Sequence, residues 1–435
     1  MEDQTKSNIN RVNNPSDEIF ADYSPTFRVY NDGRVDRLNA TKPVSASLDS
    51  ETGVESKDLI IFPETGVSVR VFNPIQIFQC STCRKMPLIM YCHGSGFCSG
   101  STFYPVYHNF LNRLALETQA IIVSVEYRKA TEYPLPVAYD DCWDALLWIF
   151  SHDPNTYPGN KLTVFLTCVQ NRVGFISGRV GSQVFTGPGW FQFAIFSGSV
   201  GLGWVGFGSG QAKQHLSGID KQNIVPVCFI ELARYLKSLK NPVKQTSRIH
   251  STKEPWLESS KVDFSRLFLS GDSSGANVAH QVTLRAGVEI NKKIVYGLIL
   301  IQPFFWGKVP IGNEINCKRG QDGAALSTKL WAAARWGSPA SLDDPWMNPA
   351  KDPTLSSLGC RRVLICLAQK DVLRDRGLFY GNALKKSGWL GDVKVEEIKG
   401  EDHVFHLIKP SSPKTLDLMR QIQDFVNCNN PESKL

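Results

Sequence analysis

The chain has 435 residues, of which 42% are hydrophobic and 20% are charged, and its formal net charge is +7. This globular composition excludes a mainly disordered, collagen-like or coiled-coil protein. Ten lysines and arginines but only two acidic residues fall within 154–252, so that segment carries +8 and the rest of the chain −1. Because the positive charge is local, we do not expect a nucleic-acid partner.

The cysteines do not form a recognisable framework. There are eleven, an odd number, and they are scattered along the chain. Cys80 and Cys83 form a single CxxC pair without a second pair, which favours free thiols over a zinc site. The first fourteen residues contain acidic residues and no apolar run, unlike a secretory signal. We therefore expect a reduced, cytoplasmic protein without a metal or cofactor.

The first part of the chain predicts short strands followed by helices. Residues 31–33 have the sequence Asn-Asp-Gly, which favours a hairpin turn. Two wholly apolar runs suit central strands that are covered on both faces. The predicted strands are 27–30, 34–38, 67–72, 87–91 and 120–125, and the predicted helices are 107–117 and 137–150.

The last part of the chain continues this alternation of strand and helix. The predicted strands are 266–270, 296–302, 363–368 and 393–398, and the predicted helices are 276–286, 377–387 and 413–426. Alternating strands and helices indicate a doubly wound α/β sheet.

Residues 154–252 do not follow this rhythm. No aspartate or glutamate occurs from 154 to 219, and no charged residue from 180 to 212. We consider a transmembrane helix, a flexible insertion or lid, and non-coding sequence carried into the translated chain, such as a retained intron. A biased composition without periodicity favours the third interpretation, so we expect no membrane partner. Only 227–239 has the pattern of a short helix.

The strongest motif is the sequence Gly-Asp-Ser-Ser-Gly at 271–275. It follows a predicted strand and precedes a predicted helix, which is the context of a nucleophile elbow with Ser273 at its tip. The glycines leave room for a tight turn. The helix N-terminus favours the negative charge that develops during attack on a carbonyl.

A serine nucleophile needs a histidine base, and in this architecture the order along the chain is Ser, then Asp or Glu, then His. His280, His403 and His406 follow Ser273. His280 falls on the helix after the elbow and is expected to point away. His403 falls in a loop just after a predicted strand, where we expect the base. His406 is the alternative.

The carboxylate that orients the base is expected at the end of the preceding strand. Asp371 follows the predicted strand 363–368 at this position. Asp375 is the alternative, although its place suggests the first turn of a helix.

Backbone N–H groups are needed to hold the oxyanion of a tetrahedral intermediate. The sequence His-Gly-Ser-Gly-Phe at 93–97 follows a buried strand, as an oxyanion loop does. We expect the N–H groups of Gly94, Ser95 and Ser274 to be the donors, provided that Ser95 avoids a positive φ. His93 is expected to brace the loop.

Together these motifs resemble the plant carboxylesterase family, in the hormone-sensitive-lipase-like branch of the α/β hydrolases. The similarity covers about 17–153 and 253–428 and is carried by 27–37, 125–128, 133–136, 138–141, 271–277, 371–377 and 403–405. It implies an α/β-hydrolase fold with a mostly parallel sheet, helices on both faces and a helical cap built partly from the N-terminal segment. It also implies ester substrates and no metal.

The sequence departs from this family in three places. Ser95 stands where the family has a glycine, and residues 129–131, Lys-Ala-Thr, stand where it tends to have Leu-Ala-Pro. Residues 154–252 replace a much shorter link. We therefore predict one α/β-hydrolase domain over 17–428 with an atypical insertion at 154–252.

The predicted function is a serine carboxylesterase that hydrolyses small-molecule esters through an acyl-enzyme. Ser273, Asp371 and His403 together favour hydrolysis over a gibberellin-receptor role, because those receptors lack the histidine. A dehydratase or cyclase type of lyase and a non-catalytic receptor remain alternatives, as does an inactive chain if 154–252 is not native sequence.

Overall fold

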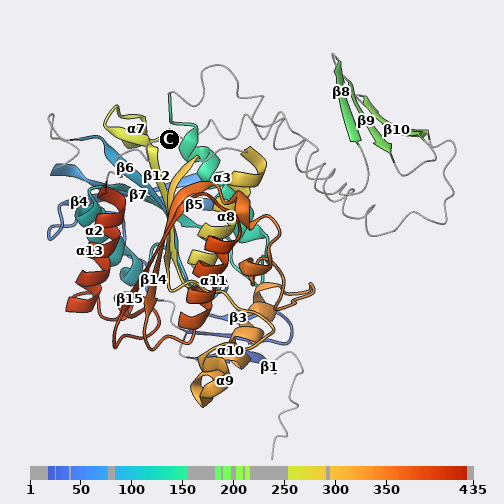
Figure 1. Ribbon diagram of the computed structural model, residues 1–435. Helices are drawn as coiled ribbons and strands as arrows, with labels where there is room; N and C mark the ends of the chain where they lie inside the picture. The colour runs from blue at the N-terminus through green and yellow to red at the C-terminus, as the bar shows by residue number, and fades with distance from the viewer. Residues whose placement is uncertain are drawn as a thin grey trace, which may run out of the picture. The chain divides into compact units, whose positions relative to one another are not determined.

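The computed structural model describes residues 18–24, 26–38, 41–76, 84–154, 253–290 and 294–428, together with four strands between 182 and 215 (Figure 1). The chain divides into two compact units. The main unit comprises 1–153, 252–288 and 292–435, and the inserted unit comprises 154–251 and 289–291. Cys80, Cys83 and the helix predicted at 227–239 lie outside the described residues.

The main unit is built on an eight-stranded sheet with the order β15-β14-β13-β12-β6-β7-β5-β4. The six strands from β15 to β7 are parallel, and β5 and β4 extend the sheet with antiparallel pairing. The predicted mostly parallel sheet is confirmed. Its strands are β4 (Val54–Phe62), β5 (Val67–Pro74), β6 (Met86–Cys92), β7 (Ile121–Glu126), β12 (Val262–Asp272), β13 (Val295–Ile301), β14 (Cys360–Ala368) and β15 (Asp392–Ile398).

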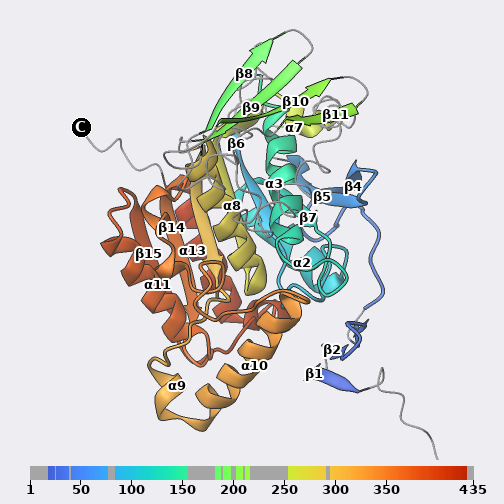
Figure 2. The same cartoon turned by 90° about the vertical axis from the view of Figure 1, so that its right-hand side faces the viewer.

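Helices cover both faces of this sheet. In Figures 1 and 2, α2 and α13 lie on one face, and α3, α8 and α11 lie on the other. Every residue of β6 is buried, which explains why this central strand is apolar on both of its sides. The helices are α2 (Pro105–Thr118), α3 (Val137–Phe150), α8 (Ser274–Ile290), α11 (Arg374–Lys386) and α13 (Pro413–Asn427).

An N-terminal sheet packs against a helix that the sequence did not predict. The sheet consists of β1 (Ile19–Tyr23), β2 (Phe27–Tyr30) and β3 (Val35–Asp36), and the turn at 31–33 joins β2 to β3 as predicted. The Phe20 and Trp336 rings meet edge to face at 5.1 Å, just beyond helix α10 (Lys318–Ala334). The buried face of α10 includes Gly320, Gly323 and Ser327, so it lacks the apolar stripe that reveals a helix in sequence.

The inserted unit contains a four-stranded antiparallel sheet with the order β11-β10-β9-β8. Its strands are β8 (Ser182–Gly187), β9 (Trp190–Phe196), β10 (Leu202–Gly208) and β11 (Gln211–His215). The transmembrane-helix interpretation is therefore wrong for the described part of this run, which is strand. Among the helices that the structure describes, none has the length and apolar character needed to span a membrane.

The two segments of the main unit that flank the insertion lie in contact with each other. The chain leaves at the end of α3 and returns at a short helix, α7 (Pro255–Glu258). The Glu254 backbone N–H donates a hydrogen bond to His152 Nε2 at 3.2 Å, and both side chains are buried. The Glu254 carboxylate also accepts a hydrogen bond from the Trp256 backbone N–H and so caps α7. The two flanks of the insertion are thus joined within the main unit.

Candidate active site

The motif at 271–275 forms a sharp turn between β12 and α8. Ser273 at its tip has φ +51°, a left-handed conformation that is strained for a residue with a side chain. The Ser273 N–H donates to the Ile301 carbonyl at 2.9 Å, which anchors the turn to β13. A Cβ on Gly275 would lie 2.1 Å from the Cys92 carbonyl oxygen, and one on Gly271 would lie 2.4 Å from the Gly275 carbonyl oxygen. Only glycine fits at either position.

Ser273, His403 and Asp371 form a continuous line of hydrogen bonds. His403 Nε2 lies 2.9 Å from Ser273 Oγ, and His403 Nδ1 lies 2.8 Å from Asp371 Oδ2. Asp371 is buried in the loop after β14, and its other carboxylate oxygen accepts the Leu373 N–H at 2.9 Å. Because a carboxylate only accepts, the proton of neutral His403 lies on Nδ1, and Nε2 is free to accept the serine proton.

The surroundings of His403 suit a base. Burial lowers the pKa of His403, but the carboxylates around it, Asp371 foremost with Asp272 and Asp402, together raise it more, so the net pKa lies above the usual 6.5. Asp371 thus stabilises the imidazolium that forms when His403 accepts a proton.

The alternative residues lie elsewhere. His406 belongs to α12 (Phe405–Ile408), and its ring packs 4.9 Å from that of Phe110. Burial lowers the pKa of both His406 and His280 to about 3, and no hydrogen-bond partner for either ring occurs in the described part of the chain. Asp375 lies in the first turn of α11, as its position suggested, and accepts the Asn313 N–H at 2.8 Å.

The oxyanion loop differs from the expectation at two residues. The Gly94 N–H donates to Tyr107 Oη at 2.9 Å and to Asp272 Oδ1 at 3.1 Å, so it is already engaged on the buried side of the loop. The expectation that Gly94 serves as an oxyanion donor is therefore not met in this structure. Ser95 has φ +76°, so the expected avoidance of a positive φ is wrong. That condition was also unnecessary, because a positive φ strains the residue but leaves its N–H able to donate.

Three other backbone N–H groups remain available at this loop and at the elbow. Those of Ser95, Gly96 and Ser274 have no hydrogen-bond partner within the described ranges. Ser274 also ties the two elements together, because its Oγ accepts the Phe97 N–H at 3.2 Å. Sequence reasoning missed Gly96. Its φ of +67° and its place in the loop make it a further candidate donor.

The buried Asp272 carboxylate holds the oxyanion loop by a hydrogen bond to the Gly94 N–H. Asp272 accepts hydrogen bonds from Tyr91 Oη at 2.8 Å and Tyr107 Oη at 3.1 Å, in addition to the Gly94 N–H. Burial raises the pKa of Asp272 to about 6, although these hydrogen bonds lower it. Sequence reasoning missed this network. The acidic residue inside the elbow motif was the one signal for it.

Helix α10, called the cap helix below, approaches the oxyanion loop closely. A Cβ on Gly96 would lie 2.7 Å from a methyl carbon of Leu330 on α10. The Phe97 ring packs edge to face against Phe304 at 6.0 Å and against Trp331 of α10 at 6.4 Å. The rings that pack beside the loop are therefore apolar and buried, so α10 is held against the loop by hydrophobic contacts.

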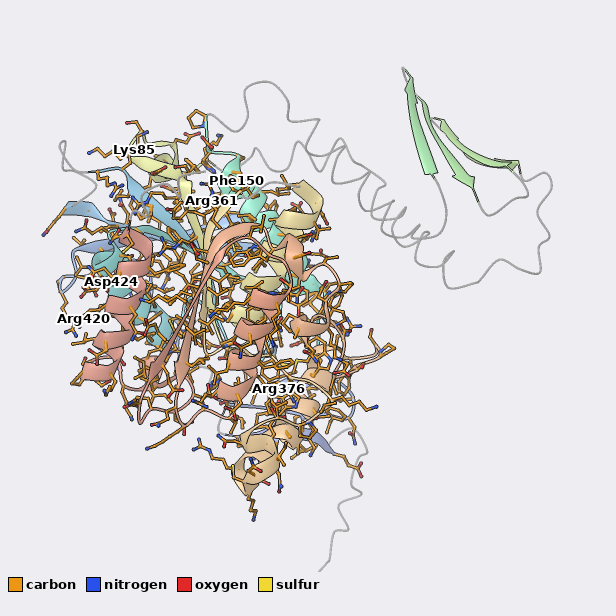
Figure 3. All side chains as sticks on the ribbon, in the orientation of Figure 1. Lys85, Phe150, Arg361, Arg376, Arg420 and Asp424 are labelled. Atoms are coloured by element: carbon orange, nitrogen blue, oxygen red, sulfur yellow. The ribbon has the colours of Figure 1, made fainter. Side chains whose placement is uncertain are left out.

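Buried charge anchors the segment before this cap helix. Arg376, labelled on α11 in Figure 3, pairs with Glu314 at 2.6 Å, and both side chains are almost fully buried. Arg376 also donates to the Gly307 and Val309 carbonyls. Because α11 begins just after Asp371, these contacts join the cap to the loop that carries the carboxylate. In the described part of the chain, no group of His, Cys, Asp and Glu side chains has an arrangement that fits a metal ion.

Comparison of the chain with known proteins identifies one family. A family model described as alpha/beta hydrolase fold matches residues 89–167 and 226–407 and leaves out 168–225, which lies inside the inserted unit. Solved structures support the fold. They include an esterase of Pyrobaculum calidifontis (TM-score 0.52, 19% identity, 86% of this chain and 84% of that chain) and one from Rhizomucor miehei (TM-score 0.53, 17% identity, 87% and 84%).

Curated relatives at higher identity are plant proteins. Probable carboxylesterase 4, mitochondrial, of Arabidopsis thaliana is 32% identical over 96% of this chain and 89% of its own length. Probable carboxylesterase 7 of the same plant is 31% identical over 94% and 99%, and a 2-hydroxyisoflavanone dehydratase of Glycine max is 30% identical over 94% and 99%. The names of the two carboxylesterases support the predicted enzyme class, a carboxylic ester hydrolase. The chain belongs to the plant carboxylesterase family of α/β hydrolases.

Proposed function

We propose that the protein is a serine carboxylesterase that hydrolyses small-molecule carboxylic esters through an acyl-enzyme. The observation that carries this proposal is the hydrogen-bonded line from Ser273 Oγ through His403 to the buried Asp371 carboxylate. This is the geometry of a nucleophile, its base and the group that orients the base.

The first half of the reaction forms the acyl-enzyme. Ser273 Oγ attacks the ester carbonyl carbon while His403 Nε2 accepts the serine proton. The negative oxygen of the tetrahedral intermediate is held by the N–H groups of Ser95, Gly96 and Ser274. His403 then gives its proton to the departing alcohol, and the carbonyl re-forms on Ser273.

The second half releases the acid. Water takes the place of the alcohol, His403 accepts one of its protons, and the hydroxide attacks the acyl carbonyl. When the second intermediate collapses, His403 returns the proton to Ser273 Oγ. Throughout the cycle Asp371 remains ionised, because its role is to hold the imidazole and to stabilise its charged form.

A lyase is the second candidate, and one comparison favours it. A relative with 30% identity is named 2-hydroxyisoflavanone dehydratase. In a dehydration a base removes a proton and water leaves, without cleavage of an ester; in this chain His403 would be that base. A non-catalytic receptor, the third candidate, binds a small molecule without turnover, although His403 supplies the base that such a role does not need.

Product analysis separates these candidates. We expect p-nitrophenyl acetate to give a burst of nitrophenolate, and mass spectrometry to find one acetyl group on the peptide that contains Ser273. Ser273→Ala should remove both signals. Loss of water from a hydroxylated substrate without any acyl-enzyme would favour the lyase, and tight binding without either product would favour the receptor.

The cell compartment is also proposed rather than established. We propose the cytoplasm, and the mitochondrial name of one relative makes the mitochondrion the alternative. Fractionation of plant cells that express the tagged full chain distinguishes the two.

A further inference from the structure

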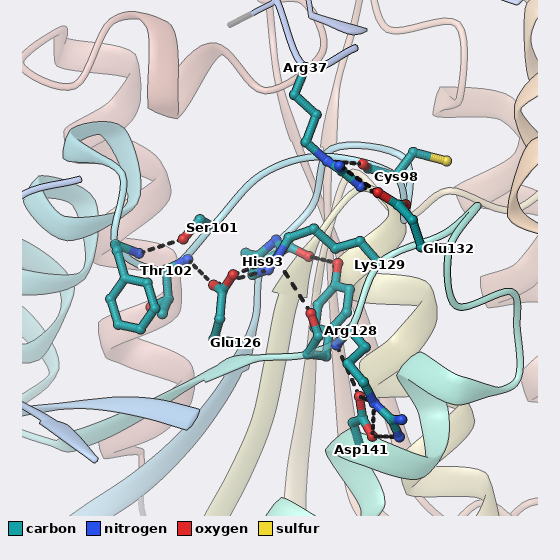
Figure 4. Close-up of polar contacts among 12 residues, drawn as sticks. Arg37, His93, Cys98, Ser101, Thr102, Glu126, Arg128, Lys129, Glu132 and Asp141 are labelled. Carbon is teal, nitrogen blue, oxygen red and sulfur yellow. Dashed lines mark hydrogen bonds and ion pairs between the residues drawn. The ribbon is translucent and has the colours of Figure 1, made fainter. Parts of the chain in front are cut away.

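His93, at the start of the oxyanion loop, belongs to a network of polar contacts with Glu126, Lys129 and Thr102 (Figure 4). The His93 ring lies against this loop, with Nδ1 3.0 Å from the Gly94 carbonyl oxygen. Since a carbonyl only accepts, Nδ1 must carry the proton of this hydrogen bond. The carbonyl of Gly94 and the N–H of Ser95 belong to one planar trans peptide and point in opposite directions. By holding the Gly94 carbonyl, His93 therefore sets the direction of the Ser95 N–H.

The other nitrogen of His93 has an unusual environment. Nε2 lies 3.7 Å from Glu126 Oε2, at the end of β7, and is buried without a hydrogen-bond partner. In the neutral ring with the proton on Nδ1, this nitrogen carries a lone pair and faces a carboxylate. A proton on Nε2 would turn the contact into a hydrogen bond of about 2.8 Å. That change would draw the ring about 1 Å towards Glu126 and away from the Gly94 carbonyl.

Lys129 competes for the same carboxylate. Its Nζ contacts Glu126 Oε1, while Glu126 Oε2 accepts the Thr102 N–H at 2.9 Å. Both side chains of the pair are largely buried, with 16% and 17% of their area exposed. Burial raises the pKa of Glu126, but the Lys129 charge and the hydrogen bonds from Lys129 and the Thr102 N–H act against it, and the net pKa lies below its usual value. The carboxylate therefore stays ionised and paired with the lysine.

The two tyrosines that face the His93 ring stay neutral. Tyr127 stacks on it at 4.3 Å and donates its Oη to the His93 carbonyl at 2.7 Å, and the Tyr107 ring lies at 5.7 Å. Burial raises the pKa of both tyrosines well above 10. The acidic group Asp272 lies on the other side of Tyr107 and accepts a hydrogen bond from its hydroxyl. Burial lowers the pKa of His93 to about 4; the Glu126 carboxylate acts against this change, and Lys129 acts with it.

We propose that Lys129 is a positioning residue: by pairing with Glu126 it keeps His93 in the neutral form that donates to the Gly94 carbonyl and so holds the Ser95 N–H in place. The effect on catalysis rests on the proposed function.

Three variants of the full chain test the proposal. Lys129→Met removes the charge, Lys129→Arg keeps it, and the pair Glu126→Gln with Lys129→Met removes both charges. Without Lys129 the pKa of His93 rises, so the ring gains a proton as pH falls and is drawn towards Glu126. We expect Lys129→Met to lower kcat about tenfold at pH 6 and to leave KM within about twofold of the wild-type value. Loss of a whole oxyanion donor lowers kcat about 100-fold or more, and a donor that is only misaligned should lower it less.

The pH profile and an inhibitor separate this role from a general structural one. The loss in Lys129→Met should disappear towards pH 9, and the inhibition constant of a trifluoromethyl ketone, which forms an oxyanion on Ser273, should weaken by the same factor as kcat. Lys129→Arg and the double variant should behave like the wild type. Equal pH profiles for Lys129→Met and the wild type would overturn the proposal.

A spectroscopic readout keeps the test independent of activity. Nitrogen-15 spectra of the His93 ring should show the neutral Nδ1–H form from pH 5.5 to 9 in the wild type and a titration within that range in Lys129→Met. A wild-type ring that is cationic or protonated on Nε2 at pH 7 would contradict the proposal even if the variants fail to fold. If the wild type hydrolyses no ester, the proposed function fails, and these spectra still decide the role of Lys129.

Discussion

The two units of the chain use opposite ways of building a sheet. In the main unit β6 pairs with β12, although about 170 residues separate them along the chain. The insertion, which lies between α3 and α7, is part of that separation. In the inserted unit every described strand pairs with the next strand in sequence. Local hairpins form with a small loss of chain entropy, whereas distant parallel pairing needs the whole unit in place. The inserted sheet therefore needs no strand from the main unit.

The two units also differ in charge, and the main unit has a contact of its own across the insertion point. The segment 154–252 carries +8, and the rest of the chain is close to neutral. The main unit is closed across the insertion by the hydrogen bond from the Glu254 N–H to His152. Since all of the residues proposed for chemistry lie in the main unit, we expect activity and folding of that unit to be independent of 154–252.

The largest effect is expected for the nucleophile. Ser273→Ala should lower kcat/KM for p-nitrophenyl acetate by about 10⁴- to 10⁶-fold, because the covalent route is lost. Ser182→Ala, the same substitution in β8 of the inserted unit, is the matched control and should leave the rate unchanged. Comparable losses in both variants would break the assignment of the chemistry to the main unit.

The next effect concerns the orienting carboxylate. Asp371→Asn should lower kcat about 10⁴-fold by favouring the wrong tautomer of His403. His403 acts in its neutral form and Asp371 raises its pKa, so wild-type activity should fall as pH drops through a value above 6.5. In Asp371→Asn the residual activity should persist to lower pH. A pH–rate profile of both proteins checks the direction, and an unmoved acidic limb would contradict this role.

A third effect concerns stability. Arg376→Met leaves Glu314 charged and buried without its partner, which should lower the free energy of unfolding of the main unit by about 3 to 5 kcal/mol. Adding Glu314→Gln should recover part of this loss, and Lys213→Met in β11 should not move the transition. Urea unfolding followed by tryptophan fluorescence measures all three. An Arg376→Met loss below about 1 kcal/mol would show that this pair does not anchor the cap.

The smallest effect on activity is expected when the whole segment 154–252 is deleted. Joining Asp153 directly to Lys253 removes 154–252 but keeps His152 and Glu254, which already lie within hydrogen-bond distance. Purified protein of this design should hydrolyse p-nitrophenyl acetate with kcat and KM within about threefold of those of the full chain. Loss of soluble protein or of activity would mean that the inserted unit supports the main one.

The sequence predicted most elements of the main sheet because their signals are local. The apolar run at 87–91 became the buried strand β6, and the helix at 137–150 was predicted with the bounds that the structure gives α3. Helix α10 was missed because small and polar side chains face its neighbours. Strand β4 was missed because it lies at the sheet edge and mixes exposed and buried positions without strict alternation.

In the active site, too, some residues could be predicted from local sequence patterns and others could not. Ser273, Asp371 and His403 followed from a short motif and from the order of residues along the chain, and the structure brings them together. The oxyanion donors did not follow, because the direction of each N–H depends on distant partners. Gly94 is turned inwards by Asp272, which lies 178 positions away. No local pattern encodes such a contact.

The central claim is that a complete serine hydrolase site assembles within the main unit. It is tested most directly by labelling with a fluorophosphonate probe, applied to the full chain, to the chain without 154–252, and to each with Ser273→Ala. We expect both parent proteins to be labelled at similar rates and both Ser273→Ala variants to remain unlabelled. Absence of labelling in both parents, with each shown to be folded by its unfolding transition, would contradict the claim.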